Sequence, residues 1–274
     1  MRLFEPPPPL TPAQLLGWYL DAGVDEAIGD VALDRYALAD RRAHAPLAVD
    51  AASGQSPDRP AVAAPPSTEA AVRGAADLAS ACHSLEDLRA AMEAYEGCAL
   101  KRTCQRTVFA DGAADAPVML IGEAPGADED RLGLPFVGAS GKLLDRMLAS
   151  IGLERGAVYI TNVVPWRPPA NRKPEPTEVA LCLPFIVRHI ELVRPALLVF
   201  LGGAPATALL GRHDAISRLR GRWFDYQSPG LVAPIPAMPT YHPAYLLRTP
   251  HHKREAWSDL LSIRKRLARH SEKT

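Results

Sequence analysis

Four side chains that could take part in binding or catalysis stand in short segments rich in glycine and proline. They are Glu123 in "GEAPG", Phe136 in "LPFVG", Asn162 in "ITNVVP" and His242 in "TYHPAYLLR". Together they offer a carboxylate, an aromatic ring, a carboxamide and an imidazole. Each also has a structural explanation, as a helix cap, a core ring or a turn residue. Their joint placement favours one pocket, because convergent polar groups are the ordinary mark of a site.

The elements that position these residues alternate between strands and helices. The pattern predicts strands at "PVMLIGE", "AVYITNVVP" and "ALLVFLGG", and helices at "SGKLLDRMLASIGL", "TEVALCLPFIVRHIELV" and "APATALLG". Strands that are apolar almost throughout, separated by helices, indicate a parallel sheet covered on both faces. The fold class is therefore α/β, and ligands are expected outside the carboxyl ends of the strands. Glu123, Asn162 and the pair Gly202 and Gly203 fall at such ends.

A nucleotide cofactor is disfavoured by the glycine-containing turns. "GASGKLL" resembles the end of a phosphate loop, but Phe136 occupies the position of the first glycine and Leu143 that of the Ser or Thr. "GEAPGADEDRLG" lacks the dinucleotide fingerprint, and its acidic side chains would repel phosphate.

Composition argues against a fibrous or a membrane-bound protein. The apolar fraction is 47% and the charged fraction 23%, as in soluble globular proteins. With neither a membrane span nor a leader segment in view, we expect a cytoplasmic protein. The 31 basic and 31 acidic residues balance. Basic runs near the C-terminus, "RLRGR" and "IRKRLARH", suit a solvated helix face, with phosphate contact as the alternative.

The chain before the alternating region divides into two parts. Residues 1–42 are expected to form a helical extension, because "TPAQLLGWYLDAGV" has helical periodicity. Residues 43–66 contain few large apolar side chains, and we predict a flexible linker. The main domain is expected over 67–274. It opens with helical segments at "STEAAVRGAADLASAC" and at "SLEDLRAAMEAYEGC", where Ser84 and Asp87 form a capping-box pattern.

Three motifs together resemble the family 4 uracil-DNA glycosylases. "GEAPGADED…LPFVGASG", "YITNVVPWRPPANRKPEPTEVALC" and "HPAYLLR" occur in the order and spacing of that family, and the resemblance runs from about Ala94 to Ala268. It implies a three-layer α/β/α domain around a mostly parallel, four-stranded sheet. It also implies a monofunctional DNA glycosylase that flips uracil out of DNA and hydrolyses its N-glycosidic bond, leaving an abasic site.

The resemblance assigns roles to the four candidate residues. Phe136 would stack on uracil, and Asn162 would hydrogen-bond its edge as donor and acceptor. His242 would donate to the carbonyl oxygen that gains charge as uracil leaves. Glu123 would position the attacking water and face the positive charge that develops on the sugar. The remaining uracil-binding and DNA-binding positions implied are Ala124, Gly126, Arg167, Arg172, Lys173, Tyr245, Leu246 and Arg248.

Several alternatives stay open at this point. Either Tyr245 or Leu246 would fill the space that the flipped base leaves. The substrate could extend to hypoxanthine or xanthine, or the chain could be a non-catalytic nucleic-acid-binding module of a repair complex. No membrane partner is expected, and we expect a monomer. The N-terminal extension is a candidate docking segment for a repair or replication protein.

The cysteines depart from the family pattern. Four irregularly spaced cysteines, Cys82, Cys98, Cys104 and Cys182, suggest reduced thiols or a metal site. Members of the family hold a [4Fe-4S] cluster with four cysteines, of which Cys98 and Cys182 match two. Tyr95 and Trp166 occupy the other two positions. We therefore expect no metal and no cluster, with aromatic packing in its place. If a cluster is present, Cys98 and Cys182 are its ligands, with Cys82 or Cys104 as candidate substitutes.

Overall fold

The structure, a computed structural model, describes residues 68–271 of the 274-residue chain. The predicted helical extension over 1–42 and the predicted linker over 43–66 lie outside the described residues, so both stay predictions. None of the described helices is long and apolar enough to cross a membrane.

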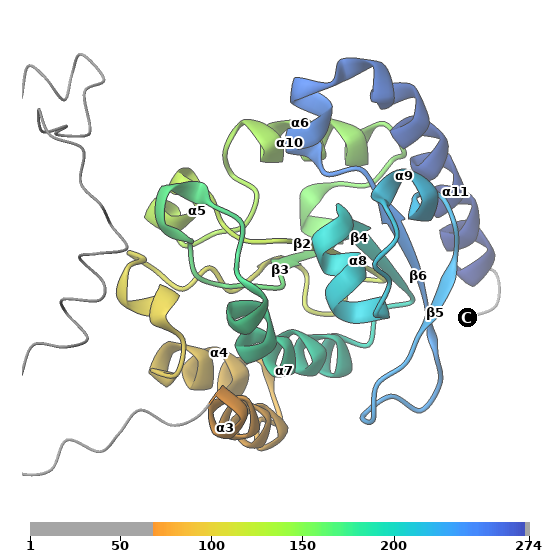
Figure 1. The fold of residues 1–274 in the computed structure, drawn as a ribbon. Coiled ribbons are helices and arrows are strands. Elements are labelled where there is room, and N and C mark those ends of the chain that lie inside the picture. The colour runs from red at the N-terminus through yellow and green to blue at the C-terminus, as the bar shows by residue number, and fades with distance from the viewer. Residues whose placement is uncertain (1–67, 272–274) are drawn as a thin grey trace, which may run out of the picture. The chain divides into compact units, whose positions relative to one another are not determined.

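A mixed sheet of six strands forms the centre of the domain, in the order β1-β3-β2-β4-β6-β5 (Figure 1). The strands are β1 (Asp111–Gly112), β2 (Val118–Gly122), β3 (Tyr159–Asn162), β4 (Leu197–Leu201), β5 (Phe224–Tyr226) and β6 (Ile235–Thr240). The four central strands, β3, β2, β4 and β6, are parallel to one another. The edge strands β1 and β5 are antiparallel to their neighbours.

The α/β prediction is confirmed, but the predicted count of four strands is wrong. The two additional strands contain only two and three residues. A segment this short carries no readable alternation of apolar and polar residues, so sequence periodicity gave no signal for it.

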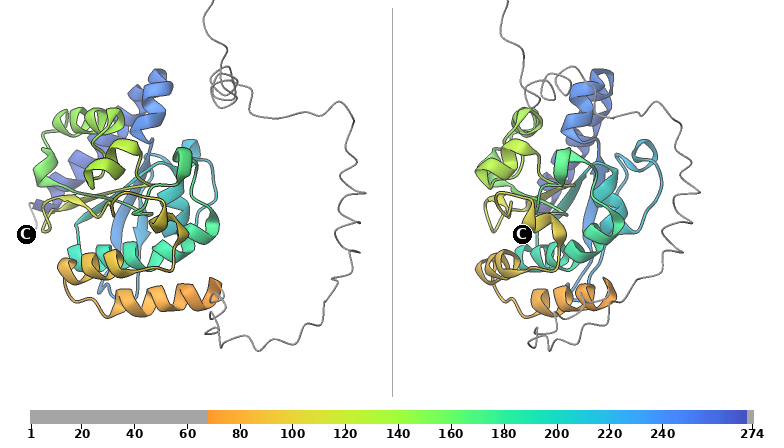
Figure 2. Two further views of the ribbon diagram at one scale, coloured as in Figure 1. Left: turned by 90° about the vertical axis from the view of Figure 1, so that its left-hand side faces the viewer. Right: turned by 60° about the vertical axis from the view of Figure 1, so that its left-hand side comes forward.

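Helices cover both faces of the sheet, and Figure 2 shows the resulting layers from two further directions. The helices are α3 (Thr68–Ser80), α4 (Leu85–Ala94), α5 (Ala127–Leu132), α6 (Ala139–Ala149), α7 (Pro176–Val193), α8 (Gly203–Leu210), α9 (Ile216–Leu219), α10 (Pro243–Arg248) and α11 (Lys253–Ser271). Short 3-10 turns are η1 (Ala99–Arg102), η2 (Arg155–Ala157), η3 (Pro169–Asn171) and η4 (Pro250–His252). The predicted capping box of α4 is confirmed, because Ser84 and Asp87 each accept the other's backbone N–H at 3.0 Å.

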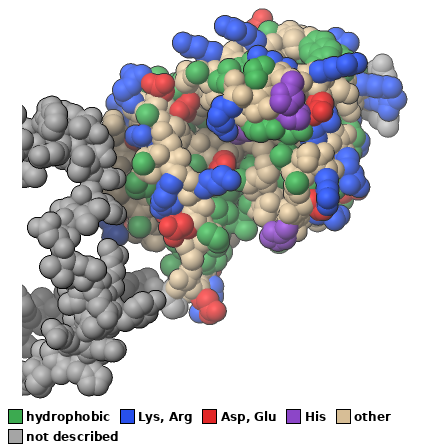
Figure 3. Space-filling view, turned by 45° about the horizontal axis from the view of Figure 1, so that its top comes forward, with side chains coloured by type: hydrophobic (Ala, Val, Ile, Leu, Met, Phe, Trp, Pro, Cys, Tyr) green, Lys and Arg blue, Asp and Glu red, His purple; other side chains and the backbone are tan. Residues whose placement is uncertain are grey.

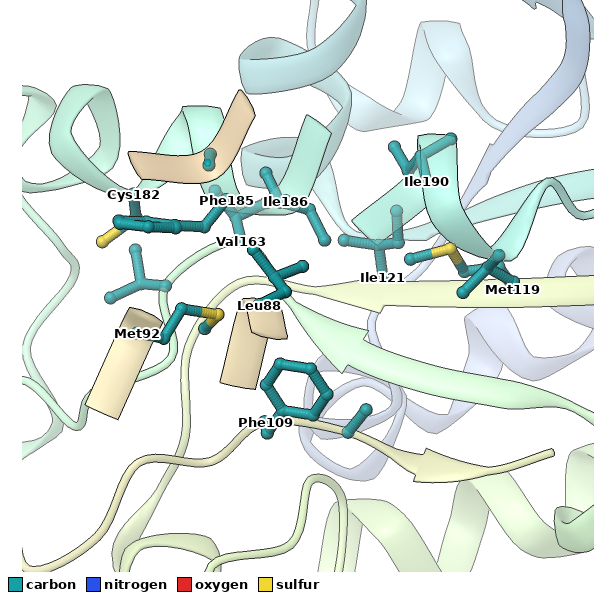
Figure 4. Packing of buried hydrophobic residues seen from close by; sticks show 14 of the residues in the cluster. Leu88, Met92, Phe109, Met119, Ile121, Val163, Cys182, Phe185, Ile186 and Ile190 are labelled. Carbon is teal, nitrogen blue, oxygen red and sulfur yellow. The ribbon is translucent and has the colours of Figure 1, made fainter. Parts of the chain in front are cut away.

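Successive strand residues enter opposite core layers, since side chains alternate across a sheet. Met119 and Ile121 of β2 pack with α3, α4, α7 and α8. Val118 and Leu120 pack with α6, α10 and α11. Figure 4 shows part of the first layer, in which Cys182 and Phe185 of α7 lie close to Met92 of α4. Because the central strands are parallel, and buried apart from Pro236 of β6, their carboxyl ends are fixed at one edge of the sheet.

Candidate active site

A pocket of about 610 Å³ lies at this carboxyl edge, and it collects most of the predicted site residues. Its lining includes Glu123, Ala124, Gly126, Phe136, Asn162, Arg172, Lys173, His242, Tyr245 and Arg248. Figure 3 turns the upper end of the Figure 1 view forward, and Lys and Arg side chains are spread over this face. Tyr241, Ile216 and Ser140 also line the pocket and were not predicted.

The floor of the pocket is built from the neighbouring ends of β2 and β3. Gly122 pairs with Asn162 across these two strands. A Cβ at Gly122 would overlap Asn162 Oδ1 and lie 2.6 Å from Cζ of Phe136, so only glycine fits this position. Asn162 is 5% exposed, and its Oδ1 atom has no hydrogen-bond partner among the described residues. A buried polar atom without a partner is destabilising, so this oxygen is available for a ligand.

His242 follows β6 and caps the start of α10. Its Nδ1 atom accepts the backbone N–H of Ala244 at 3.0 Å, which places the ring proton on Nε2. Burial lowers the pKa of His242 to about 4, and the nearby Arg248 charge acts in the same direction. The imidazole is therefore neutral at physiological pH and carries its one N–H on the free nitrogen. Its ring lies 5.5 Å from the Phe136 ring, with an angle of 31° between the planes.

Glu123 occupies the turn directly after β2. The backbone N–H of Val164 donates to the Glu123 carbonyl oxygen at 3.0 Å, which ties this turn to the end of β3. Burial raises the pKa of the Glu123 carboxyl group, and the positive charge of Lys173 partly opposes that shift. The carboxylate thus sits in an environment that favours its neutral form more than water does.

The predicted arginines differ in what they contact. Arg172 Nη1 and Nη2 donate to the two Glu178 carboxylate oxygens at 2.8 and 2.6 Å. Arg167 Nε donates to Asn171 Oδ1 at 2.8 Å, and its Nη1 lies 3.9 Å from Asp130. Arg172 lines the pocket, whereas Arg167 lies outside its lining.

Helix α10 separates the two predicted wedge residues. Tyr245 lines the pocket, and its ring lies 5.1 Å from that of Tyr241 and 5.4 Å from that of His252. Leu246 is 1% exposed and packs in the core layer with α6 and α11. The structure therefore brings Tyr245 to the pocket and places Leu246 in the core. The next residue, Leu247, is 44% exposed.

Sequence reasoning missed two charged residues that hold the Phe136 loop. Glu129 accepts three backbone N–H groups, and Arg155 donates to two backbone carbonyl oxygens. Glu129 could have been found from its place three residues after Gly126, as in a capping box. Arg155 gave no signal, because its partners are distant in the sequence.

The cysteine region does not fit a four-thiolate cluster. Cys98 and Cys182 are fully buried and hydrogen-bonded to each other, which lowers the pKa of Cys98 and raises that of Cys182. Tyr95 stacks on Trp166, with ring centroids 6.1 Å apart and 19° between the planes. The Trp166 indole N–H donates to Thr107 Oγ1 at 3.1 Å. The two thiols supply half of the four ligands that a [4Fe-4S] cluster takes, and the two packed rings supply none.

The other cysteines do not complete such a set. Cys82 donates its thiol to the Leu78 carbonyl oxygen at 3.2 Å, and Cys104 donates to that of Lys101 at 3.3 Å. No group of three or more His, Cys, Asp and Glu side chains is arranged around a common point within residues 68–271.

Comparison with known proteins agrees with this geometry. Residues 109–261 match the model of the Uracil DNA glycosylase superfamily. The chain is 42% identical over 184 residues to the type-4 uracil-DNA glycosylase of Archaeoglobus fulgidus, covering 66% of this chain and 92% of the relative. It is 37% identical over 180 residues to that of Pyrobaculum aerophilum, covering 64% and 91%. The chain therefore belongs to the uracil-DNA glycosylase superfamily and, within it, to the type-4 family.

Proposed function

We propose that this chain is a monofunctional uracil-DNA glycosylase that acts in base excision repair. The observation that carries the proposal is the pair of groups facing one pocket, the unpartnered Asn162 oxygen and the neutral His242 with its proton on Nε2. A carboxamide and an N–H donor match the edge of uracil, which has both acceptor and donor atoms. The relatives named as type-4 uracil-DNA glycosylases support the same substrate.

In the proposed reaction, a flipped uracil stacks on Phe136 over Ala124 and Gly126 while Asn162 pairs with its edge. The bond between the sugar carbon and the base nitrogen breaks, and its electron pair leaves with the uracil. His242 Nε2–H donates to the uracil oxygen that gains negative charge. Glu123 orients the water that attacks the sugar carbon, and its carboxylate faces the positive charge on the sugar. Water supplies the hydroxyl group to the sugar and its proton to the product base.

The proposed DNA contacts follow from the pocket rim. Lys173 and Arg248 line the pocket and would meet phosphates, and Tyr245 would enter the gap that the flipped base leaves. Arg172 is paired with both Glu178 oxygens, so it would contact phosphate only by sharing or giving up that ion pair. Arg167 stays a weaker candidate because it lies outside the lining. We further propose a monomeric, cytoplasmic protein, with residues 1–42 as a docking segment for a repair or replication protein.

We also propose that aromatic packing replaces the iron-sulfur cluster of the family. The stacked Tyr95 and Trp166 rings and the two thiols pack together in the first core layer. Hydrolysis of a glycosidic bond transfers no electrons, so the chemistry requires no redox centre.

Release of uracil from an oligonucleotide tests the proposed function. Intact protein in excess over a uracil-containing strand, single- or double-stranded, is expected to give an abasic site that alkali converts to a break. Matched strands with cytosine or thymine are the controls and are expected to stay intact. Product only from strands with hypoxanthine or xanthine would show that the enzyme removes those bases and not uracil. Binding to every strand with no product from any of them would support the non-catalytic alternative.

Replacing Lys173 with methionine is expected to move the acidic limb of the pH profile to higher pH. The Lys173 charge holds down the pKa of Glu123, which burial raises. Its removal lets that pKa rise, so a higher pH is needed to ionise Glu123. The measurement is the single-turnover rate against pH at saturating protein, which separates ionisation from weaker DNA binding. Lys265→Met, an exposed lysine on α11, is the matched control. An unshifted limb in Lys173→Met would exclude this coupling.

A further inference from the structure

We infer that Arg155 and Glu129 are positioning residues that clamp the Phe136 loop in the shape that stacking on a base requires. This inference rests on the proposed function for the role of the ring and goes beyond it in naming what sets the ring's position. Neither residue was assigned by the motifs above. Arg155 lies outside the lining of the pocket, so it acts through the loop and not on a substrate.

The Phe136 loop needs contacts from other parts of the fold to keep its conformation, because its backbone is strained. Phe136 has a φ of 52°, in the left-handed region that a large side chain rarely occupies. Such a conformation is strained and persists only where the surroundings impose it. In this conformation the ring is buried against Gly122 and His242. The strain is therefore located at the residue whose ring faces the pocket.

Arg155 holds the loop from its carbonyl side. Its Nη2 donates to the Pro135 carbonyl oxygen at 2.5 Å and its Nη1 to the Phe136 carbonyl oxygen at 3.0 Å. The guanidinium is itself fixed by two carboxylates, Asp111 at 2.7 Å and Asp145 at 3.0 Å. These partners come from edge strand β1 and helix α6, so the planar fork is anchored to two elements of the fold.

Glu129 holds the same loop from its amide side. Its Oε1 accepts the N–H groups of Val137 and Gly138, each at 3.0 Å, and its Oε2 accepts that of Gly126 at 3.1 Å. The Glu129 side chain is buried, so these charge-assisted bonds are poorly screened by water. One carboxylate thus joins the Phe136 loop to the turn that carries Glu123.

The two residues together fix consecutive peptide groups on both sides of Phe136. Arg155 takes the carbonyl groups of residues 135 and 136, and Glu129 takes the N–H groups of residues 137 and 138. The backbone of Gly141 in α6 lies directly against the Phe136 carbonyl group, because a Cβ there would overlap the carbonyl oxygen. The ring is therefore preorganised before any DNA is bound, and a loosened loop would lose that benefit.

The test combines hydrogen exchange with a double-mutant cycle. In Arg155→Gln without DNA, amide exchange in residues 133–141 is expected to accelerate. The single-turnover rate on uracil-containing DNA is expected to fall roughly 10- to 100-fold. Affinity for uracil-free DNA should stay unchanged, because Arg155 does not line the pocket. Arg155→Lys should recover part of the rate, because its ammonium keeps the positive charge and N–H donors that Asp111, Asp145 and the loop carbonyl groups bind. Arg131→Gln, which loses only an exposed pair with Asp128, is the matched control and should behave as the intact protein does.

The cycle separates a positioning role from general destabilisation. In a Phe136→Ala background, Arg155→Gln should have little additional effect on the rate, because the ring it positions is gone. Equal losses in both backgrounds, or unchanged exchange in residues 133–141, would overturn the clamp. Amide exchange could accelerate in Arg155→Gln while the intact protein releases no uracil. That result would support the clamp and reject the proposed function. Melting curves on all variants confirm that each is folded at the assay temperature.

Discussion

His242→Ala is expected to lower the single-turnover rate of uracil release by roughly 10²- to 10³-fold, the usual effect of removing one preorganised donor to a developing oxyanion. The donor is preorganised because the Ala244 N–H occupies Nδ1 and leaves the proton on Nε2. It is also neutral over the working range, since the His242 pKa is about 4. Rapid quench with saturating protein measures this rate without a contribution from product release.

The same substitution also removes the cap of α10. A second variant is therefore needed to separate the loss of the Nε2–H donor from the loss of the helix cap. His242→Asn keeps a short polar side chain that caps a helix start well and withdraws the donor from the pocket. It should recover stability without recovering the rate. His213→Ala, at an exposed histidine, should leave both unchanged. A loss of less than about threefold in His242→Ala would contradict the assigned role.

Trp166→Ala is expected to lower the free energy of unfolding by about 3–5 kcal/mol, the range for removing a buried tryptophan. Trp166 is fully buried, stacks on Tyr95 and donates to Thr107. If aromatic packing takes over the structural role of a cluster, this indole carries much of it. Urea unfolding followed by circular dichroism measures the change.

A second tryptophan provides the matched control. Trp257 on α11 is 42% exposed, so Trp257→Ala should change stability by less than about 1 kcal/mol. Iron content and absorbance are measured on the same purified samples. Four irons per intact chain with a band near ~400 nm would overturn the packing proposal. So would a Trp166→Ala variant as stable as the intact protein.

The convergence of Glu123, Asn162 and His242 could be predicted from the sequence because it follows from topology. Each residue stands at or just past the end of a parallel strand, and such ends meet at one edge of a sheet. The fold class followed for the same reason, since three of the four central strands, β2, β3 and β4, have strong apolar signals. The fourth, β6, contains two prolines and gave no such signal. The short antiparallel edge strands have no comparable signal.

The remaining features depend on tertiary contacts between distant residues. The sequence does not distinguish Tyr245 from Leu246 as the residue facing the pocket, because α10 has only six residues and no readable face. The left-handed backbone of Phe136 is likewise invisible, since nothing in the Phe side chain favours it. Arg155 bonds to Asp111, 44 positions away. From its residue type, Arg172 is expected to contact phosphate, whereas in the structure it forms an ion pair with Glu178.

The two edges of the sheet have a consequence for assembly. A long, flat edge strand would offer unpaired backbone groups to another chain, as in strand addition and aggregation. Here the outermost strands, β1 and β5, contain two and three residues. So little edge leaves no room for an intermolecular ladder of useful length. Strand addition at β1 or β5 would therefore gain few backbone hydrogen bonds, so we expect proteins that bind this domain to recognise mainly its side chains.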